Sequence, residues 1–370
     1  VENSVVLSGP FSTFTLDRLT TVGDTIQLDV EVAFTIALPA LETARSIRIS
    51  SWSAHEIGDF TELTHIDWIH ISGASLTHIG DFDSLIDVAT CNVLPARPWE
   101  SCDGQPDPIR TDTATGTDTE VGSDAPNCDD VLAHGPWVSL DGPAMAHPAA
   151  FPSLVRVSNL TVGGGVPMPD MPSADSLCRV QLQYTAATPT FSAVLAAATR
   201  ELRVFDPTAP LSLDLSAMSG LSRLSIDGVP ERSVINDLVL PETTMPALRG
   251  LSLVSLQLPA TVTWPQWTPQ LAEFDMRYVS GVRTIDGFSD TANVELTVRG
   301  SDDLTTLGGF ADANTLRLTV TDNPALTSMT AAMHATELRW SEIYGNSSLC
   351  AAQTDRFAAL GAYVSDNGPC

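Results

Sequence analysis

Apolar residues recur in this chain at a spacing of 22 residues, and no other feature of the sequence constrains the fold as strongly. In the stretch 284–329 each of these apolar residues has a counterpart 22 positions later. The pairs are Ile285 and Leu307, Leu307 and Met329, Phe288 and Phe310, Leu296 and Leu318, Val298 and Val320, and Leu304 and Leu326. A fixed period of about 20 to 29 residues is typical of a solenoid, in which each coil stacks on the one before it.

The spacing extends through most of the chain as short triplets, in which an exposed residue lies between two apolar ones. Such alternation indicates a strand with one buried face. Triplets 22 residues apart begin at Ile47, Ile69 and Cys91, at Val180, Leu202 and Leu224, and at Phe274, Leu296 and Leu318. Others begin at Ile26, Leu160 and Leu251, at steps of 20 to 27 residues. No helical period recurs inside the coils, so the sequence predicts a mainly β fold, a β-helix-like solenoid with coils of about 22 residues.

The segments "LTVTDNPALTSM" (318–329) and "IYGNSSLC" (343–350) each carry a strand, a turn and an Asn-x-x-Leu unit. They resemble the repeats of receptor L-domains, the leucine-rich-repeat-like β-helices in the ectodomains of the insulin and epidermal growth factor receptors. Similar domains occur in bacterial surface proteins. The resemblance is strongest over 270–350 and extends over 150–350 and 40–94. It implies a right-handed β-solenoid used for recognition, and it transfers no ligand-binding or catalytic residue.

The spacing stops between Val93 and about Pro152, where the sequence is rich in Pro, Gly, Thr and Asp. We therefore predict four parts, namely N-terminal coils (1–94), an acidic insertion loop (95–150), C-terminal coils (151–349) and a disulfide-tied helical cap (350–370). Repeat proteins carry insertions on one face, often the binding face. Asp residues within 103–130 could supply oxygen ligands for calcium, but they lack the register of an EF-hand loop. A solvated acidic loop is therefore favoured, and no other cofactor is predicted.

The six cysteines lack the Cys and His spacings of a zinc site, so disulfides are their favoured use. Disulfides persist in oxidising compartments, which indicates an extracellular or cell-surface protein. We predict that Cys350 pairs with Cys370. Cys102 and Cys128 bracket the acidic stretch and are ranked first among the remaining pairings, which stay open.

A solenoid needs its terminal coils covered, because an exposed edge strand pairs with other chains. At the C-terminus, Phe357, Leu360 and Tyr363 have helical spacing, so we predict a short capping helix there. The N-terminus shows no comparable cap. An open edge at that end would suit self-assembly or a partner domain.

The chain has 18 basic and 45 acidic residues and a formal net charge of -27. Nucleic acids and anionic membranes attract proteins with a basic surface, so neither is an expected partner. No run of 18 or more apolar residues occurs, and we expect no membrane insertion.

Four histidines, His55, His65, His70 and His78, lie close together in the sequence. At a 22-residue step they do not share a column, so we expect scattered surface imidazoles and no metal site. No motif of a known hydrolase, metalloprotease or nucleotide-binding enzyme occurs. We therefore predict that the protein is not an enzyme. The alternative is a polysaccharide-active β-helix enzyme, in which an arginine such as Arg277 acts with a nearby acid such as Asp275.

Charged residues gather on the outward face of the last coils. The candidate ligand-binding residues are Glu273, Asp275, Arg277, Glu295, Arg299, Arg317 and Arg339. A 22-residue step sets like charges side by side, as in Arg277 with Arg299, and such neighbours are mildly destabilising. A face that keeps them on an acidic protein suits docking of an acidic or glycan partner. Diagonal ion pairs that relax the repulsion are the alternative interpretation.

These features favour a non-catalytic recognition or adhesion module that binds a protein or glycan partner at a cell surface. The second interpretation is a structural subunit of a surface assembly or filament, joined to its neighbours through the N-terminal edge. A mainly β solenoid with repeated outward columns is compatible with both functions.

Overall fold

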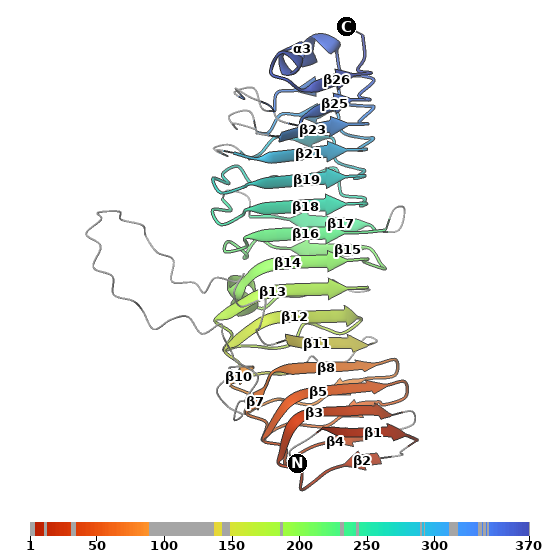
Figure 1. Ribbon diagram of the computed structural model, residues 1–370, viewed down its shortest axis with the longest axis vertical. Helices are drawn as coiled ribbons and strands as arrows, with labels where there is room; N and C mark the ends of the chain where they lie inside the picture. Colours follow the sequence, from red (N-terminus) through yellow and green to blue (C-terminus); the bar gives the residue numbers. More distant parts are fainter. Residues whose placement is uncertain are drawn as a thin grey trace, which may run out of the picture.

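Successive coils of the chain stack along one axis, with the two termini at opposite ends of the molecule (Figure 1). The structure is a computed structural model, and it describes residues 4–10, 13–30, 35–88, 137–142, 149–185, 188–229, 233–241, 244–288, 291, 293–310, 317–331, 335, 338 and 340–369. Each coil contributes one strand to a long parallel sheet, called the main sheet below. This is the mainly β solenoid that the repeated spacing predicts.

All neighbouring strands of the main sheet are parallel. In the order in which they pair, they are β1 (Val5–Gly9), β3 (Thr21–Val30), β5 (Thr43–Ser51), β8 (Trp68–Gly73), β11 (Trp137–Gly142), β12 (Arg156–Gly164), β13 (Ser176–Gln183), β14 (Thr199–Phe205), β16 (Arg223–Asp227), β18 (Gly250–Val254), β19 (Glu273–Arg277), β21 (Glu295–Arg299), β23 (Arg317–Thr321), β25 (Glu342–Tyr344) and β26 (Tyr363–Ser365). Two short strands, β7 (His65–Ile66) and β10 (Asp87–Val88), extend the rows of β8 and β11.

Smaller parallel sheets close the other sides of the coils. They are formed by β2 (Thr13–Thr15), β4 (Thr35–Ala37), β6 (Glu56–Ile57) and β9 (His78–Ile79); by β15 (Leu211–Asp214) and β17 (Ile235–Val239); and by β20 (Thr284–Ile285), β22 (Thr306–Leu307) and β24 (Ser328–Met329). Two helices lie within the described residues, α2 (Ala193–Ala198) and α3 (Ala351–Ala359).

The pairing register of the strands reproduces the predicted spacing. Leu296 of β21 pairs with Leu318 of β23, a step of 22 residues. The longer predicted step also occurs, because Leu224 of β16 pairs with Leu251 of β18. Since parallel strands lie about 4.8 Å apart, each inward side chain packs directly on its counterpart in the next coil.

The inward columns form one continuous hydrophobic core. The residues predicted to be buried are at most 1% exposed, namely Phe288, Leu296, Val298, Phe310, Leu318 and Val320. Phe288 and Phe310 stack with their ring centroids 4.7 Å apart and their planes 6° apart. In the N-terminal coils Phe60, Phe82 and Phe151 form a second stack of the same kind. The spacing of the apolar residues therefore predicted the core correctly.

Most main-sheet strands from β12 onward end at a corner residue with a left-handed backbone. The residues with this conformation, with φ between 45° and 72°, are Gly164, Tyr184, Asp206, Ser255, Tyr278, Gly300, Asp322, Gly345 and Asp366. Their amide groups continue the ladder, as in Tyr278, whose N–H donates to the carbonyl of Arg299 at 2.8 Å. Glycine and aspartate tolerate such a backbone, whereas a tyrosine adopts it at a steric cost.

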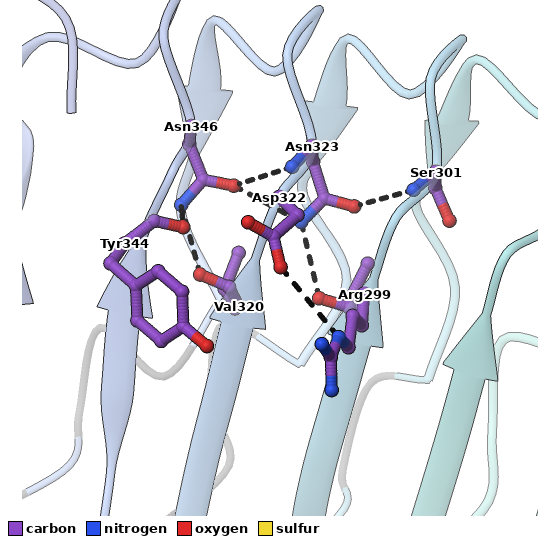
Figure 2. Close-up of polar contacts among 8 residues, drawn as sticks. Arg299, Ser301, Val320, Asp322, Asn323, Tyr344 and Asn346 are labelled. Carbon is purple, nitrogen blue, oxygen red and sulfur yellow. Dashed lines mark hydrogen bonds and ion pairs between the residues drawn. The ribbon is translucent and has the colours of Figure 1, made fainter. Parts of the chain in front are cut away.

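Asparagines secure the C-terminal corners from the inside (Figure 2). The Nδ2 of buried Asn346 donates to the carbonyl oxygens of Val320 at 2.9 Å and Tyr344 at 3.1 Å. Its Oδ1 accepts from the backbone N–H and the Nδ2 of Asn323, both at 3.1 Å. Asn323 in turn accepts from the N–H of Ser301 at 3.0 Å. Because a buried polar group without a partner costs about 1–3 kcal/mol, this ladder fixes the position of each corner.

Strand β11 corrects the extent of the insertion, because it lies within the range 95–150 for which a loop was expected. Val138 of β11 pairs with Ile69 on one side and with Leu160 on the other. It takes the place expected for the triplet at Cys91, which lies outside the described residues. A 22-residue step back from Leu160 reaches Val138, whereas a forward step from Ile69 does not.

The chain leaves the main sheet in the middle of one row. Val88 is the last residue of β10 and Trp137 is the first of β11, and both strands pair with the row formed by β7 and β8. Asp67 is the single residue between β7 and β8, whereas residues 89–136 separate β10 from β11 in the sequence. The register on both sides of the interruption is unchanged, so the main sheet accommodates the insertion without a break in its columns.

The predicted short helix is present at the C-terminus, although it ends before Tyr363. Helix α3 (Ala351–Ala359) buries Phe357, and Leu360 is its C-cap. Gly361 follows with a φ of 99°, a left-handed conformation that ends a helix. Tyr363, expected on the helix, begins β26 instead and pairs with β25. The cap is therefore a helix followed by one more row of the main sheet.

Cys178 and Cys350 each take part in a disulfide bond. Cys370, the predicted partner of Cys350, lies outside the described residues, and so do Cys102 and Cys128. Both predicted pairings therefore stay predictions.

We expect Leu318→Ala to lower the free energy of unfolding by about 2–5 kcal/mol, because the cavity lies in a column that cannot collapse. Leu318 is fully buried, whereas its neighbour Thr319 points outward. Urea unfolding followed by circular dichroism measures the change. Thr319→Ala is the control and should alter the free energy by less than about 0.5 kcal/mol. Equal losses in the two variants would contradict a buried column at Leu318.

Candidate functional site

The outward face of the main sheet is the candidate functional surface. Side chains along each strand alternate between core and solvent, so columns of outward residues run along the solenoid. In β21 the outward residues are Glu295, Thr297 and Arg299, and Leu296 and Val298 are buried between them. Because rows are about 4.8 Å apart, this face is a fixed array of functional groups.

The register brings together most of the charged residues expected on this face. Glu273 lies beside Glu295, and Arg277 lies beside Arg299, as the 22-residue step predicts. Arg317 lies beside Glu295, and its Nη1 is 4.0 Å from the carboxylate. Two expected like-charge neighbours are therefore present, together with one opposite-charge pair.

A 22-residue step also predicts Arg339 beside Arg317, but the step between these two strands is different. Thr319 of β23 pairs with Glu342 of β25, one residue beyond a 22-residue step. The pairing begins at Thr319, so it does not bring a described residue beside Arg317. The coil between these strands is one residue longer, and Arg339 lies outside the described residues.

Acidic partners compensate the arginines of this predicted surface. The Nε of Arg277 donates to the carboxylate of Asp275 at 2.9 and 3.0 Å, and this contact raises the pKa of Arg277. The Nε of Arg299 lies 3.6 Å from Asp322 at the next corner (Figure 2). Its guanidinium carbon is 5.8 Å from the ring centroid of Tyr278. Ion pairs of this kind relieve the repulsion between Arg277 and Arg299, which was the alternative interpretation.

A second arginine cluster lies in the rows of β13, β14 and β16, where the sequence predicted no ligand-binding residue. The Nε of Arg179 donates to Glu201 at 2.9 Å, and its Nη2 lies 2.8 Å from the same oxygen. The Nη2 of Arg203 is 3.5 Å from that oxygen, and Arg223 is the register neighbour of Glu201 in the next row. We name Arg179, Glu201, Arg203 and Arg223 the Arg203 cluster. Two guanidinium groups contact one carboxylate there, and a third arginine lies in the next row.

The Arg203 cluster keeps an excess of positive charge. Glu201 is 7% exposed, and the Nε of Arg203 is buried without a hydrogen-bond partner among the described residues. Burial lowers the pKa of Arg203, and the charge of Arg179 lowers it further. A guanidinium group nevertheless stays protonated at physiological pH. A 22-residue step through Arg179, Glu201 and Arg223 would have found this cluster in the sequence.

The histidines do not gather into a site. His70 lies beside Arg48 in one neighbouring row and beside Ser139 in the other. Within the described ranges, no group of three or more His, Cys, Asp and Glu side chains could hold a metal ion. The segment 103–130, considered for calcium, lies outside those ranges. No described helix has the length and apolar character needed to cross a membrane.

Comparisons with protein-family models, with curated proteins and with solved structures found no match to this chain. The function is therefore inferred from the chemistry of the chain's own surfaces.

Asp227, whose carboxyl group interacts with the charge of Arg277, provides a test of the electrostatics of this face. Burial raises the pKa of Asp227, nearby Asp206 raises it further, and Arg277 lowers it. A carboxyl with a raised folded pKa favours the folded state at low pH, and that contribution is lost as pH rises through the folded pKa. We therefore expect Asp227→Asn to raise the melting temperature at pH 7 by on the order of 1 °C. Below about pH 3.5 the gain should vanish, because the wild-type carboxyl is then protonated.

Asp237→Asn is the control for this measurement, because Asp237 is an exposed carboxylate on β17 and its removal changes net charge equally. Thermal melting at a series of pH values compares the two variants. A rise of equal size in the control would assign the effect to net charge and not to the surroundings of Asp227.

Proposed function

We propose that this protein is a non-catalytic recognition or adhesion module, located outside the cell or at its surface, that binds a protein or glycan partner through the main sheet. Its outward face supports this function because it presents side chains at fixed spacing on rigid strands. Arginine and tyrosine, which are enriched at binding interfaces, occur together there, as in Arg299 with Tyr278.

The observation that carries the proposal is the Arg203 cluster in a chain of net charge -27. Arg179 and Arg203 share one nearly buried carboxylate, and the charges of Arg179 and Arg223 both act on Arg203. A bound anion would relieve the repulsion among these three cations. A partner with carboxylate or sulfate groups would pair with Arg203 and Arg223. Such charge-assisted hydrogen bonds are short and strong. Arg277, Arg299 and Arg317, each of which lies near a carboxylate, add further arginines along the same face.

A relationship to receptor L-domains, including those of bacterial surface proteins, is part of this proposal. Its support is that the Asn-x-x-Leu units at Asn323 and Asn346 supply the buried asparagine ladder at successive corners. The disulfide-bonded state of Cys178 and Cys350 supports an oxidising, extracellular location.

An assembly subunit is the second candidate function, and the N-terminal edge favours it. Strand β1 pairs with β3 on one side, and no strand within the described residues pairs with its other edge. Val5 and Leu7 at this end of the core are only partly buried. An open edge of this kind can pair with another chain.

We expect the wild-type protein to bind a member of an array of acidic peptides and of carboxylated or sulfated oligosaccharides at physiological salt. The double variant R203Q/R223Q should weaken that binding at least about tenfold, because each charge-assisted hydrogen bond contributes about 1.5–3 kcal/mol. The double variant R277Q/R299Q removes the same charge from the surface that was predicted from the sequence. Whichever of the two double variants loses more affinity identifies the surface that contacts the partner. Biolayer interferometry measures each affinity.

The matched control is R249Q/R283Q, which removes two exposed arginines that lie outside the main-sheet strands. Thermal melting verifies that all the variants are folded. The proposal is wrong if the wild-type protein binds no anionic probe, if neither variant on the face weakens binding, or if the control loses as much affinity.

Sedimentation equilibrium over a wide concentration range tests the assembly alternative. A subunit that joins through β1 should give masses that rise with concentration. Val6→Lys, at a residue 61% exposed on that strand, should abolish the rise, because a charge on an edge strand blocks pairing. A monomer mass at every concentration would exclude this alternative.

A further inference from the structure

A groove on the outward face of the N-terminal coils lies in rows separate from both arginine surfaces. It has a volume of about 460 Å³ and crosses the rows of β5, β8 and β11. The residues that line it include Ser50, Ser51, Trp52, Ser72, Gly73 and Gly142. Its volume lies within the range of about 300–1,000 Å³ that is usual for ligand pockets.

Glycines keep the floor of the groove open. A Cβ atom at Gly73 would lie 2.9 Å from the carbonyl oxygen of Ser51, and one at Gly142 would lie 3.2 Å from that of Gly73. The coils approach each other too closely at this corner for a side chain to fit without a shift. The floor therefore consists of backbone and small hydroxyl side chains, all of which can form hydrogen bonds with a ligand.

Trp52 forms the wall of the groove at the corner after β5. Its side chain is 81% exposed. The backbone around it is held by two hydrogen bonds, from the Oγ of Ser75 to the carbonyl of Trp52 at 3.0 Å and from the N–H of Ala54 to the Oγ of Ser51 at 2.9 Å. A large apolar ring is thus presented to solvent from a fixed position, as a binding platform requires.

Three further rings continue from the groove along the same face, and we name them the aromatic shelf: Trp68, His70 and Trp137. Trp68 and His70 stack at 5.7 Å with planes 13° apart. Trp137 is 43% exposed, and its ring lies 6.5 Å from that of Trp68. Its Nε1 donates to Thr161 at 3.2 Å, which orients the indole.

The aromatic shelf and the groove belong to one surface. Trp68, His70 and Ser72 are alternate residues of β8, and all three are only partly buried on the side opposite the core. At about 3.3 Å per residue, Trp68 lies about 13 Å along the strand from Ser72 in the groove. A ligand that spans this length can contact aromatic rings at both ends and hydroxyl groups between them.

The charges around this surface discriminate between ligands. Burial lowers the pKa of His70, and Arg48 lowers it further while Asp141 raises it, so the imidazole is neutral at pH 7. Asp141 is the one charged side chain among the described residues that line the groove. A carboxylate accepts hydrogen bonds from hydroxyl groups and repels other anions.

We propose that the groove and the aromatic shelf bind a neutral oligosaccharide. A sugar ring has apolar C–H faces, which pack on aromatic rings, and a rim of hydroxyl groups. The rings of Trp52 and Trp137 receive the faces, and Ser50, Ser72 and Asp141 receive the hydroxyl groups. An acidic sugar suits the Arg203 cluster instead, so the two surfaces recognise different partners, and this inference does not depend on the first.

Titration with cellotetraose, mannotetraose, xylotetraose and laminaritetraose, followed by tryptophan fluorescence and calorimetry, tests the proposal. The wild-type protein should bind at least one of them, and W52A/W137A should weaken that binding at least tenfold. W340A/W267A is a matched control, because these tryptophans are 88% and 39% exposed elsewhere on the molecule. If the double variant does not fold, the single variant W52A replaces it in the test, because Trp52 is exposed and its removal leaves the core intact.

R203Q/R223Q should leave the binding of neutral sugars unchanged. The proposal is overturned if the wild-type protein binds no neutral tetrasaccharide, if W340A/W267A loses as much affinity as W52A/W137A, or if R203Q/R223Q abolishes binding. Tighter binding of uronic acid tetrasaccharides, lost in W52A/W137A, would also overturn it, because Asp141 should repel them. If the wild-type protein binds a neutral tetrasaccharide but no anionic probe, that result contradicts the role of the Arg203 cluster and supports the groove.

Discussion

Hydrogen bonds between successive coils determine where every other group in this protein lies. Parallel strands in register stack both the inward and the outward side chains into columns. Variation in coil length is absorbed outside the main sheet, since Leu224 and Leu251 are neighbours although their coil is longer than most. Even the departure of the chain after Val88 leaves the register of the next rows intact. The hydrogen bonds between parallel strands therefore determine both the packing of the core and the arrangement of the outward face.

The core could be predicted from the sequence because burial repeats with the coil. Leu296 and Leu318 must both be apolar, so a 22-residue step finds them directly. The same step failed after Ile69, because an insertion within the row separates it from Val138. Helical spacing was misleading at Tyr363, because Gly361 ends the helix that contains Phe357 before Tyr363 is reached. Local backbone chemistry thus overrides periodicity at the places where the chain changes direction.

The outward face was less predictable, because nothing requires its residues to repeat. Register neighbours such as Arg277 and Arg299 followed from the step, but their real partners did not. Arg299 contacts Asp322, at a corner one residue beyond its register position, and Arg277 contacts Asp275 of its own strand. Such contacts depend on how far each side chain extends, and the spacing of residues in the sequence does not give that information. The pair of Arg299 with Asp322 is exposed, and such pairs contribute only about 0–1 kcal/mol, so a partner can displace it at little cost.

A solenoid of this construction separates stability from recognition. The columns of the core and the asparagine ladder at Asn323 and Asn346 fix the backbone, so outward positions can change chemistry from row to row without moving. The rows of β8 and β11 carry aromatic rings and hydroxyl groups, and those of β13 to β16 carry the Arg203 cluster. A polymer that lies along the axis meets a new row about every 4.8 Å. Its neutral and charged units would therefore contact different rows, and the order of the rows along the axis would set the order in which those units are recognised.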